Sequence, residues 1–156
     1  MSERAVYDTM LFFQWAALPE ERQHRTVKAL YDGSIRLCLS PELIAEVTDV
    51  LSRPELAEKT PSLTSRRIKQ VLDSALERAD WFDGIPHLFS WLQHPDDDHL
   101  FNLAIAAKAR YLITWERRIM KLGNAKSAIA ARLRELVPQL EIITPAQLAV
   151  RLGRYK

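Results

Sequence analysis

The sequence predicts an α/β fold, in which a parallel sheet is covered by helices on both faces. Short apolar runs that are typical of strands alternate along the chain with segments of helical periodicity. Strands that are joined through helices favour a parallel sheet, because such crossovers return the chain to the same end of the sheet. With 156 residues, of which 47% are hydrophobic, we expect one domain over residues 1–156 with a sizeable core.

The first quarter of the chain predicts two strands and the helices between them. A first strand is expected over residues 4–7, and residues 10–15 then have a helical pattern. A polar helix is expected over residues 19–31, because the turn at Gly33 is a typical helix stop. The second strand then covers residues 35–39.

The middle of the chain predicts two further helices. Ser40 is a favourable N-cap and Pro41 suits the first helical turn, so a helix is expected from there to Pro54. Residues 55–63 are polar and predict a loop or a short irregular helix. From residue 62 or 64 to residue 79, apolar residues recur at helical spacing and predict an amphipathic helix.

The stretch from Asp97 to Leu122 predicts a buried helix, a short strand that ends at Thr114, and an acidic turn at Glu116. Apolar side chains cover more than half of the circumference of this helix. Asp97 lies on its inward stripe, whereas Asp98 points away from it. The remaining expected elements are a helix over residues 125–137, a short strand over residues 141–144 and a closing helix over residues 145–152.

Composition limits the class of protein. The single cysteine, Cys38, allows no intrachain disulfide and lies in an apolar run, so we expect a small core residue. The N-terminus lacks the apolar region of a signal peptide, and no run approaches the roughly 18 apolar residues that span a bilayer, so we expect a cytoplasmic protein without membrane contact. A net charge of +2 does not by itself indicate nucleic acid. Aromatic residues crowd residues 81–92, where they either anchor a partner or cover the domain's own core.

Four acids follow or flank the predicted strands and helices: Asp8, Glu46, Asp97 and Glu116. Sites in open parallel sheets form beyond the carboxyl ends of the strands, and Asp8 and Glu116 lie just past two such ends. Plainer explanations exist for two of the four. Asp97 can cap its own helix, and Glu46, about 100° from the centre of its apolar face, can be solvated. The set of four, rather than any single member, therefore indicates a site.

Five motifs occur in a fixed order over nearly the whole chain: VYDT at 6–9, SPELIAE at 40–46, PDDD at 95–98, AIAAKARYLIT at 104–114 and ITP at 143–145. In this order and spacing they resemble a PIN domain, and most of all the VapC-like toxin components of toxin–antitoxin pairs. The resemblance implies a three-layer α/β/α fold with a central parallel sheet of four or five strands.

The resemblance also implies a metal-dependent ribonuclease site built from acids, which by position are Asp8, Glu46, Asp97 and Glu116. Clustered carboxylates repel each other unless a hard divalent cation neutralises them, so the expected cofactor is Mg²⁺ or Mn²⁺. Two of the acids, Asp8 and Asp97, would be primary ligands, while the glutamates bind metal or orient water. Thr9 and Thr114 would be small polar neighbours of these acids.

The chain departs from the family pattern at three places. Met10 stands where the family usually has Asn, and His94 stands where an acid is common. Trp115-Glu116 stands where the family usually has Gly-Asp. Glu116 keeps the negative charge on a longer arm, so it reaches metal directly, binds it through water, or leaves the site weak.

Residues around these departures are the candidates for binding RNA. Trp115 is expected either to stack on a base or to narrow the cleft. Arg117 and Arg118 are expected to hold the RNA backbone, with Lys121 beside them, because basic side chains around an acidic pocket tolerate a polyanion.

The resulting functional hypothesis is a metal-dependent endoribonuclease that hydrolyses single-stranded RNA and acts as the toxin of a toxin–antitoxin pair. The expected partners are the RNA substrate, an antitoxin protein and, by resemblance, a second copy in a homodimer. Two alternatives remain open: a catalytically weak or inactive PIN-like subunit that binds RNA or protein, and a ribonuclease of housekeeping RNA processing. A phosphate-accepting receiver domain is disfavoured, because no lysine lies at a strand end.

Overall fold

The protein has one five-stranded sheet in which every pairing is parallel. The computed structural model describes residues 2–153, and within them the strands lie in the order β3-β2-β1-β4-β5. The strand bounds are β1 Glu3–Tyr7, β2 Ile35–Leu39, β3 Ala79–Trp81, β4 Tyr111–Ile113 and β5 Glu141–Ile143. The predicted α/β fold is therefore confirmed, with the four expected strands in place and one more.

Strand β3 was not expected, because the apolar spacing that begins near residue 65 continues through Ala79. The helix α5 ends at Glu77, and Ala79 instead begins an edge strand that pairs with β2. Asp80 is held there by two arginines, with Arg36 Nε 2.8 Å and Arg4 Nε 3.2 Å from its carboxylate oxygens. These cross-strand ion pairs depend on residues about 45 and 76 positions away, so local periodicity could not reveal them.

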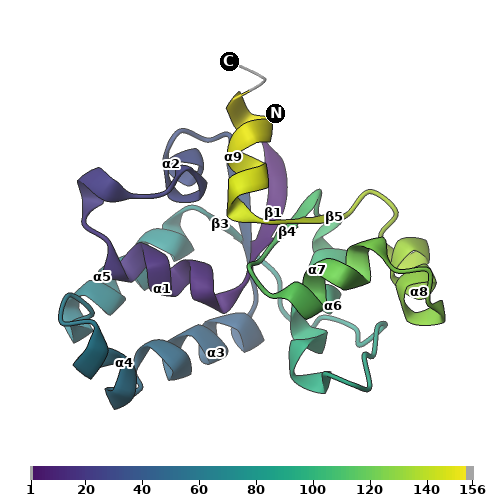
Figure 1. Cartoon of the computed structure of the whole chain (residues 1–156), viewed down its shortest axis with the longest axis horizontal. Helices are drawn as coiled ribbons and strands as arrows, with labels where there is room; N and C mark the ends of the chain where they lie inside the picture. The colour runs from purple at the N-terminus through teal and green to yellow at the C-terminus, as the bar shows by residue number, and fades with distance from the viewer. Residues whose placement is uncertain (1, 154–156) are drawn as a thin grey trace.

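Helices cover both faces of the sheet, which gives the three-layer α/β/α arrangement (Figure 1). In that view the N-terminal helices lie on the left of the sheet, whereas α6, α7 and α8 lie on the right. Helix α6 packs against the central strands β1 and β2, and α3 contacts both α1 and α6. The helix bounds are α1 Thr9–Ala17, α2 Arg25–Tyr31, α3 Pro41–Leu51, α4 Pro54–Lys59, α5 Ser65–Glu77, α6 Asp98–Ala107, α7 Arg117–Asn124, α8 Ala128–Leu136 and α9 Pro145–Gly153.

Two expected helices differ in their extents from those in the structure. The helix expected over residues 19–31 is divided into a short 3₁₀ turn at Glu20–Arg22 and α2. Gln23 lies in an extended conformation at the break, and its side-chain amide donates hydrogen bonds to two carbonyl groups at the end of α1. The helix expected over residues 125–137 is α8, which begins three residues later because Ser127 caps it.

The irregular segment between β3 and α6 is fastened to the domain by two buried side chains of α6. Asn102 accepts hydrogen bonds from the backbone N–H groups of Leu88 and Phe89, each at 2.9 Å, and donates to the carbonyl of Phe89 at 3.0 Å. Asp98 accepts from the backbone N–H of Trp91 at 2.8 Å and is buried. The prediction that Asp98 points away from the core was therefore wrong, because the segment folds back over that side of the helix.

The large apolar residues between 81 and 92 differ in burial, and two of the aromatic residues cover the domain's own core, as one of the two expectations had it. Phe89 and Trp91 are buried and pack on Phe101 of α6. Their ring centroids lie 5.0 and 5.8 Å, respectively, from that of Phe101. Trp81 and Leu92 are exposed. Cys38 is fully buried in β2, as expected of a core residue. None of the helices in residues 2–153 combines the length and hydrophobicity that crossing a membrane requires.

We expect Asn102→Ala to lower the free energy of unfolding by about 2 to 4 kcal/mol, since it leaves two backbone N–H groups in a mostly buried segment without acceptors. Urea denaturation measures this change, and amide hydrogen exchange should rise at Leu88 and Phe89. Leu92→Ala is the matched control on the same segment, because Leu92 is 90% exposed and such surface changes stay within about 0.5 kcal/mol. Equal stability of Asn102→Ala and the wild type would contradict the role assigned to this side chain.

Candidate functional site

The candidate site lies at the carboxyl ends of the two central strands. Asp8 follows β1 and Thr114 follows β4, and these strands are neighbours in the sheet. The backbone N–H of Asp8 donates to the carbonyl of Ile113 at 3.0 Å, which extends the pairing of the two strands to the edge. Sequence positions more than 100 residues apart therefore meet at the point where parallel sheets form their sites.

Both carboxylate oxygens of Asp8 accept hydrogen bonds. Oδ1 accepts a hydrogen bond from the backbone N–H of Thr9 at 2.7 Å, and Oδ2 accepts from the hydroxyl of Thr114 at 2.8 Å. The side chain is buried, with 8% of the residue exposed. These two hydrogen bonds orient the carboxylate without the asparagine amide that Met10 replaces.

Glu46 approaches Asp8 from helix α3, where Ser40 caps the first turn by accepting from the N–H of Leu43 at 3.2 Å. The hydroxyl of Thr9 donates to Glu46 Oε2, so Thr9 binds Asp8 through its backbone and Glu46 through its side chain. Glu46 is half-buried, which contradicts the alternative of a freely solvated residue.

His99 is a neighbour of the site that the sequence analysis missed. Its Nε2 lies 3.4 Å from Glu46 Oε2, which is longer than a typical hydrogen bond. Neither ring nitrogen has a hydrogen-bond partner of good geometry within the described residues. Contact with His99, followed by the hydrogen bond from Thr9, holds the pKa of Glu46 below its ordinary value despite partial burial. The sequence contained one indication of this role: His99 lies two residues after Asp97, in the helix α6 that follows the PDDD motif.

Asp97 is buried and pairs with Arg118 instead of capping its own helix. Arg118 Nε and Nη2 lie 3.1 and 3.0 Å from Asp97 Oδ2, and Nη1 lies 2.9 Å from Glu116 Oε2. One guanidinium therefore binds two of the four acids. Arg118 was expected to hold an RNA backbone, and its contacts in the structure are with these carboxylates.

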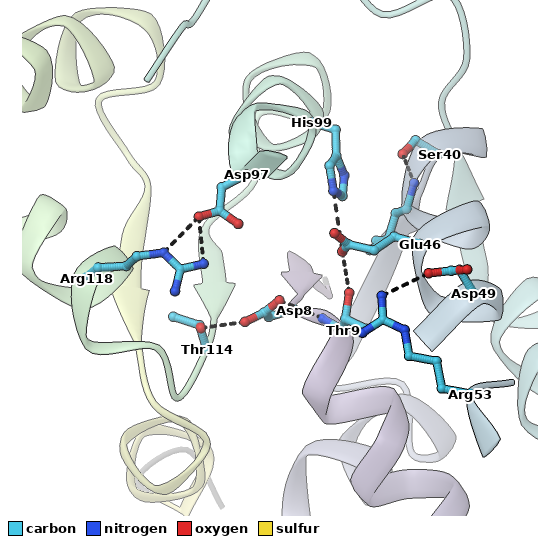
Figure 2. Close-up of polar contacts among 11 residues, drawn as sticks. Asp8, Thr9, Ser40, Glu46, Asp49, Arg53, Asp97, His99, Thr114 and Arg118 are labelled. Atoms are coloured by element: carbon cyan, nitrogen blue, oxygen red, sulfur yellow. Dashed lines mark hydrogen bonds and ion pairs between the residues drawn. The ribbon is translucent and has the colours of Figure 1, made fainter. Parts of the chain in front are cut away.

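The four acids form one continuous series of polar contacts along the edge of the sheet. Thr9 joins Glu46 to Asp8. Thr114 joins Asp8 to the backbone N–H of Glu116, which donates to its hydroxyl at 3.0 Å. Figure 2 shows Asp8 in the middle of this series, with Asp97 and Arg118 on one side and Glu46 and His99 on the other. The structure therefore brings all four acids to one edge, each separated from the next by a threonine or an arginine.

Electrostatics at the centre of the series disfavour the ionised form of Asp8. Burial raises the pKa of Asp8, and the negative charges of Glu116 and Glu46 raise it further, although the hydrogen bonds from Thr114 and Thr9 oppose the increase. The neighbouring acids are therefore close enough for their charges to act on one another.

The donor chemistry of the site fits a hard divalent cation, because the four acids offer only carboxylate oxygens. With the side chains as they stand, no group of three or more His, Cys, Asp or Glu residues within 2–153 has an arrangement that could hold a metal ion. The contacts above give the reason: Arg118 draws Asp97 and Glu116 to itself, and Thr9 and His99 draw Glu46 toward α3. Binding of an ion at this edge thus requires side-chain rotation.

Trp115 and Arg117 lie beside this edge. Trp115 is 44% exposed, and its indole N–H donates to Gln14 Oε1 at 3.3 Å, so one edge of the ring is fastened to α1. Arg117 is exposed at the start of α7. Both side chains are exposed to solvent.

A comparison with protein families finds that the PIN domain model matches residues 4–118. This range includes all of β1 except Glu3, the strands β2 to β4, all four acids and both threonines. Neither the search of curated proteins nor the search of solved structures gives a significant match.

We expect Asp8→Asn to raise the melting temperature of the metal-free protein at pH 7. An acid whose pKa is raised on folding holds more protons in the folded state, so the free energy of unfolding falls as pH rises through the interval above the ordinary value of 3.8. The asparagine does not ionise and avoids this loss. Thermal denaturation from pH 3 to pH 7 measures the melting temperatures of the variant and the wild type, and the difference between them should grow as pH rises.

The exposed Asp96→Asn is the control for the loss of one negative charge, since Asp96 lies on the same acidic motif. It should leave the pH dependence as in the wild type. A melting temperature of Asp8→Asn below that of the wild type at pH 7 would show that the hydrogen bonds outweigh the cost of burial.

Proposed function

The chain belongs to the PIN domain family, and from that premise we propose that it is a metal-dependent endoribonuclease that hydrolyses single-stranded RNA. PIN domains are generally nucleases and typically use divalent metals, which supports a hydrolase that acts on phosphodiester bonds. The observation that carries the proposal is the continuous series of contacts that joins Asp8, Glu46, Asp97 and Glu116 at the carboxyl edge of β1 and β4.

In this proposal Asp8 and Asp97 hold Mg²⁺ or Mn²⁺, because both are buried, Asp8 at the end of β1 and Asp97 at the start of α6. Glu46 and Glu116 bind the same ion or orient water. A bound divalent ion supplies an activated water and stabilises negative charge on the phosphate. Thr9 and Thr114 keep Asp8 fixed while this happens, since each donates one hydrogen bond to it.

Arg118 has two tasks in this proposal. Without metal its positive charge offsets part of the negative charge of Asp97 and Glu116, which limits repulsion among the acids. When RNA arrives, its planar guanidinium suits a phosphate as well as it suits a carboxylate, because both accept two parallel hydrogen bonds. Transfer of Arg118 to a phosphate would free Asp97 for the ion. Arg117 adds a second cation, and the accessible face of Trp115 stacks on a base.

We propose the toxin of a toxin–antitoxin pair as the biological setting, with an antitoxin protein as the partner and a homodimer as the assembly. The support for this part is the resemblance of the motif order to VapC-like toxins, especially the spacing of SPELIAE at 40–46 and PDDD at 95–98.

A second candidate is a PIN-like subunit with little or no catalytic activity. The specific observation in its favour is the ion pair of Arg118 with Asp97 and Glu116, which competes with metal for two of the four acids. Trp115 in place of a glycine also adds bulk at the edge of the site. Such a protein would bind RNA or a partner and leave the RNA intact.

The wild type is expected to cleave a mixed-sequence single-stranded RNA in the presence of Mn²⁺. Asp8→Asn and Asp97→Asn should each lower the rate by on the order of 100-fold or more, since even changes beside metal ligands cost about 10- to 100-fold. Gel analysis of a labelled RNA measures the rate, and chelation by EDTA should stop it.

Asp49→Asn is the matched control for this experiment. Asp49 lies on α3 with Glu46, but it is exposed and pairs with Arg53 at 3.0 Å (Figure 2). It should cleave like the wild type. Equal cleavage by the wild type, Asp8→Asn and Asp97→Asn would assign the activity to a contaminant and leave the inactive subunit as the better proposal.

Expression in a bacterial host separates a toxin from an enzyme of RNA processing. A toxin should arrest growth. Asp8→Asn, expressed at the same level as the wild type, should allow growth because its ribonuclease activity would be lost. Co-expression of the small protein encoded next to it should also restore growth. Normal growth with an active enzyme would contradict the toxin proposal and favour RNA processing.

A further inference from the structure

A groove of about 510 Å³ adjoins the acidic site on the side of Arg118. One wall is the irregular segment from Ser90 to His94, and the other is helix α7 with the start of α8. Pockets of about 300 to 1,000 Å³ are the usual size for small ligands, so the groove is large enough for one nucleotide.

The groove has an apolar floor and a cationic border. Its apolar lining includes Trp91, Leu92, Leu122 and Ile129. Its charged lining is Arg118 and Lys121, and no acidic residue of the described part lines it. A base needs an apolar surface and a phosphate needs cations, so the groove matches both parts of a nucleotide, as in proteins that bind single strands.

Arg118 connects this groove to the acids. It lines the groove, and its guanidinium lies 3.0 Å from Asp97 and 2.9 Å from Glu116. A strand with one phosphate at the acids would therefore pass Arg118 before its next nucleotide reaches the groove. Leu92, which is 90% exposed, also lines the groove and is accessible to such a nucleotide.

The groove is formed before any ligand arrives. Asp98 holds the backbone of Trp91, and Asn102 holds the backbone of Leu88 and Phe89, so the segment that makes the wall is fastened to α6. A wall that is already ordered lowers the entropic cost of binding.

We propose that this groove binds one unpaired nucleotide of the substrate, adjacent to the phosphate that is cleaved at the acids. Lys121 contacts the phosphate of that nucleotide, and Leu92 contacts its base. The proposal rests on the proposed ribonuclease function and adds to it a binding position for the neighbouring nucleotide, which an unpaired base can enter without the cost of leaving a duplex.

Lys121→Glu tests the cationic border. Fluorescence anisotropy of a labelled 12-nucleotide RNA in EDTA measures affinity without cleavage. The variant should bind about 10-fold more weakly. The slope of log affinity against log salt concentration should become less steep by an amount that corresponds to the loss of about one to two phosphate contacts. Lys108→Glu is the charge-matched control, because Lys108 is exposed at the opposite end of α6 from Asp97. It should stay within about 2-fold of the wild type.

Leu92→Ala tests the apolar part with a pair of RNA probes. It should weaken binding of the intact RNA about 3- to 10-fold, because the contact of a base with a leucine side chain is weaker than stacking on an aromatic ring. On an RNA with abasic nucleotides throughout, Leu92→Ala and the wild type should bind equally. Leu92 is exposed, so the variant folds normally.

The outcomes separate this proposal from the proposed function. If Lys121→Glu and Leu92→Ala lose affinity as described but the wild type does not cleave with Mn²⁺, the groove stands and the ribonuclease proposal fails. If the wild type cleaves and both variants bind and cleave like it, the groove proposal is overturned. In that case the groove is left as a surface for an apolar side chain of a protein partner.

Discussion

Repulsion among four carboxylates at one edge of the sheet is the constraint to which the rest of the site responds. Each acid is separated from the next by a group that donates hydrogen bonds: Thr9, Thr114 or Arg118. The threonines fix Asp8 from both sides, and the single positive charge of Arg118 offsets part of the charge of Glu116 and Asp97. The arrangement keeps the acids close without metal, at the cost of an unfavourable environment for Asp8. Ionisation of Asp8 in this environment therefore lowers the stability of the fold.

The sheet order makes this arrangement available. Because β1 and β4 are neighbours, Asp8 and Thr114 meet although 106 residues separate them. Helix α3 brings Glu46 from one side and the motif before α6 brings Asp97 from the other. Residues that are scattered in the sequence thereby become one surface, and the fastened segment before α6 extends that surface into a groove.

The sequence could reveal the strands and the acids because both have local signals. The apolar run that precedes Asp8 predicts a strand with this acid at its carboxyl end. The capped helix after Ser40 places Glu46 on the side of the helix that contacts Thr9. The strand β3 and the contacts of His99 and Arg118 have no such signal. The pairing of β3, the contact of His99 with Glu46 and the contact of Arg118 with Asp97 each depend on a partner more than 20 positions away along the chain, and neither composition nor periodicity contains information about such contacts.

The double engagement of Arg118 has a thermodynamic consequence. One guanidinium cannot keep its full contacts with Asp97 while it serves a phosphate in the groove, so the occupancies of the two places are linked. Under the proposed function, a nucleic acid that attracts Arg118 would increase the affinity of the acids for an ion, and by reciprocity the ion would increase the affinity for nucleic acid by the same factor. Titration of each ligand in the presence of the other would measure this coupling. A site built in this way would hold its cation weakly without RNA and firmly only with RNA bound.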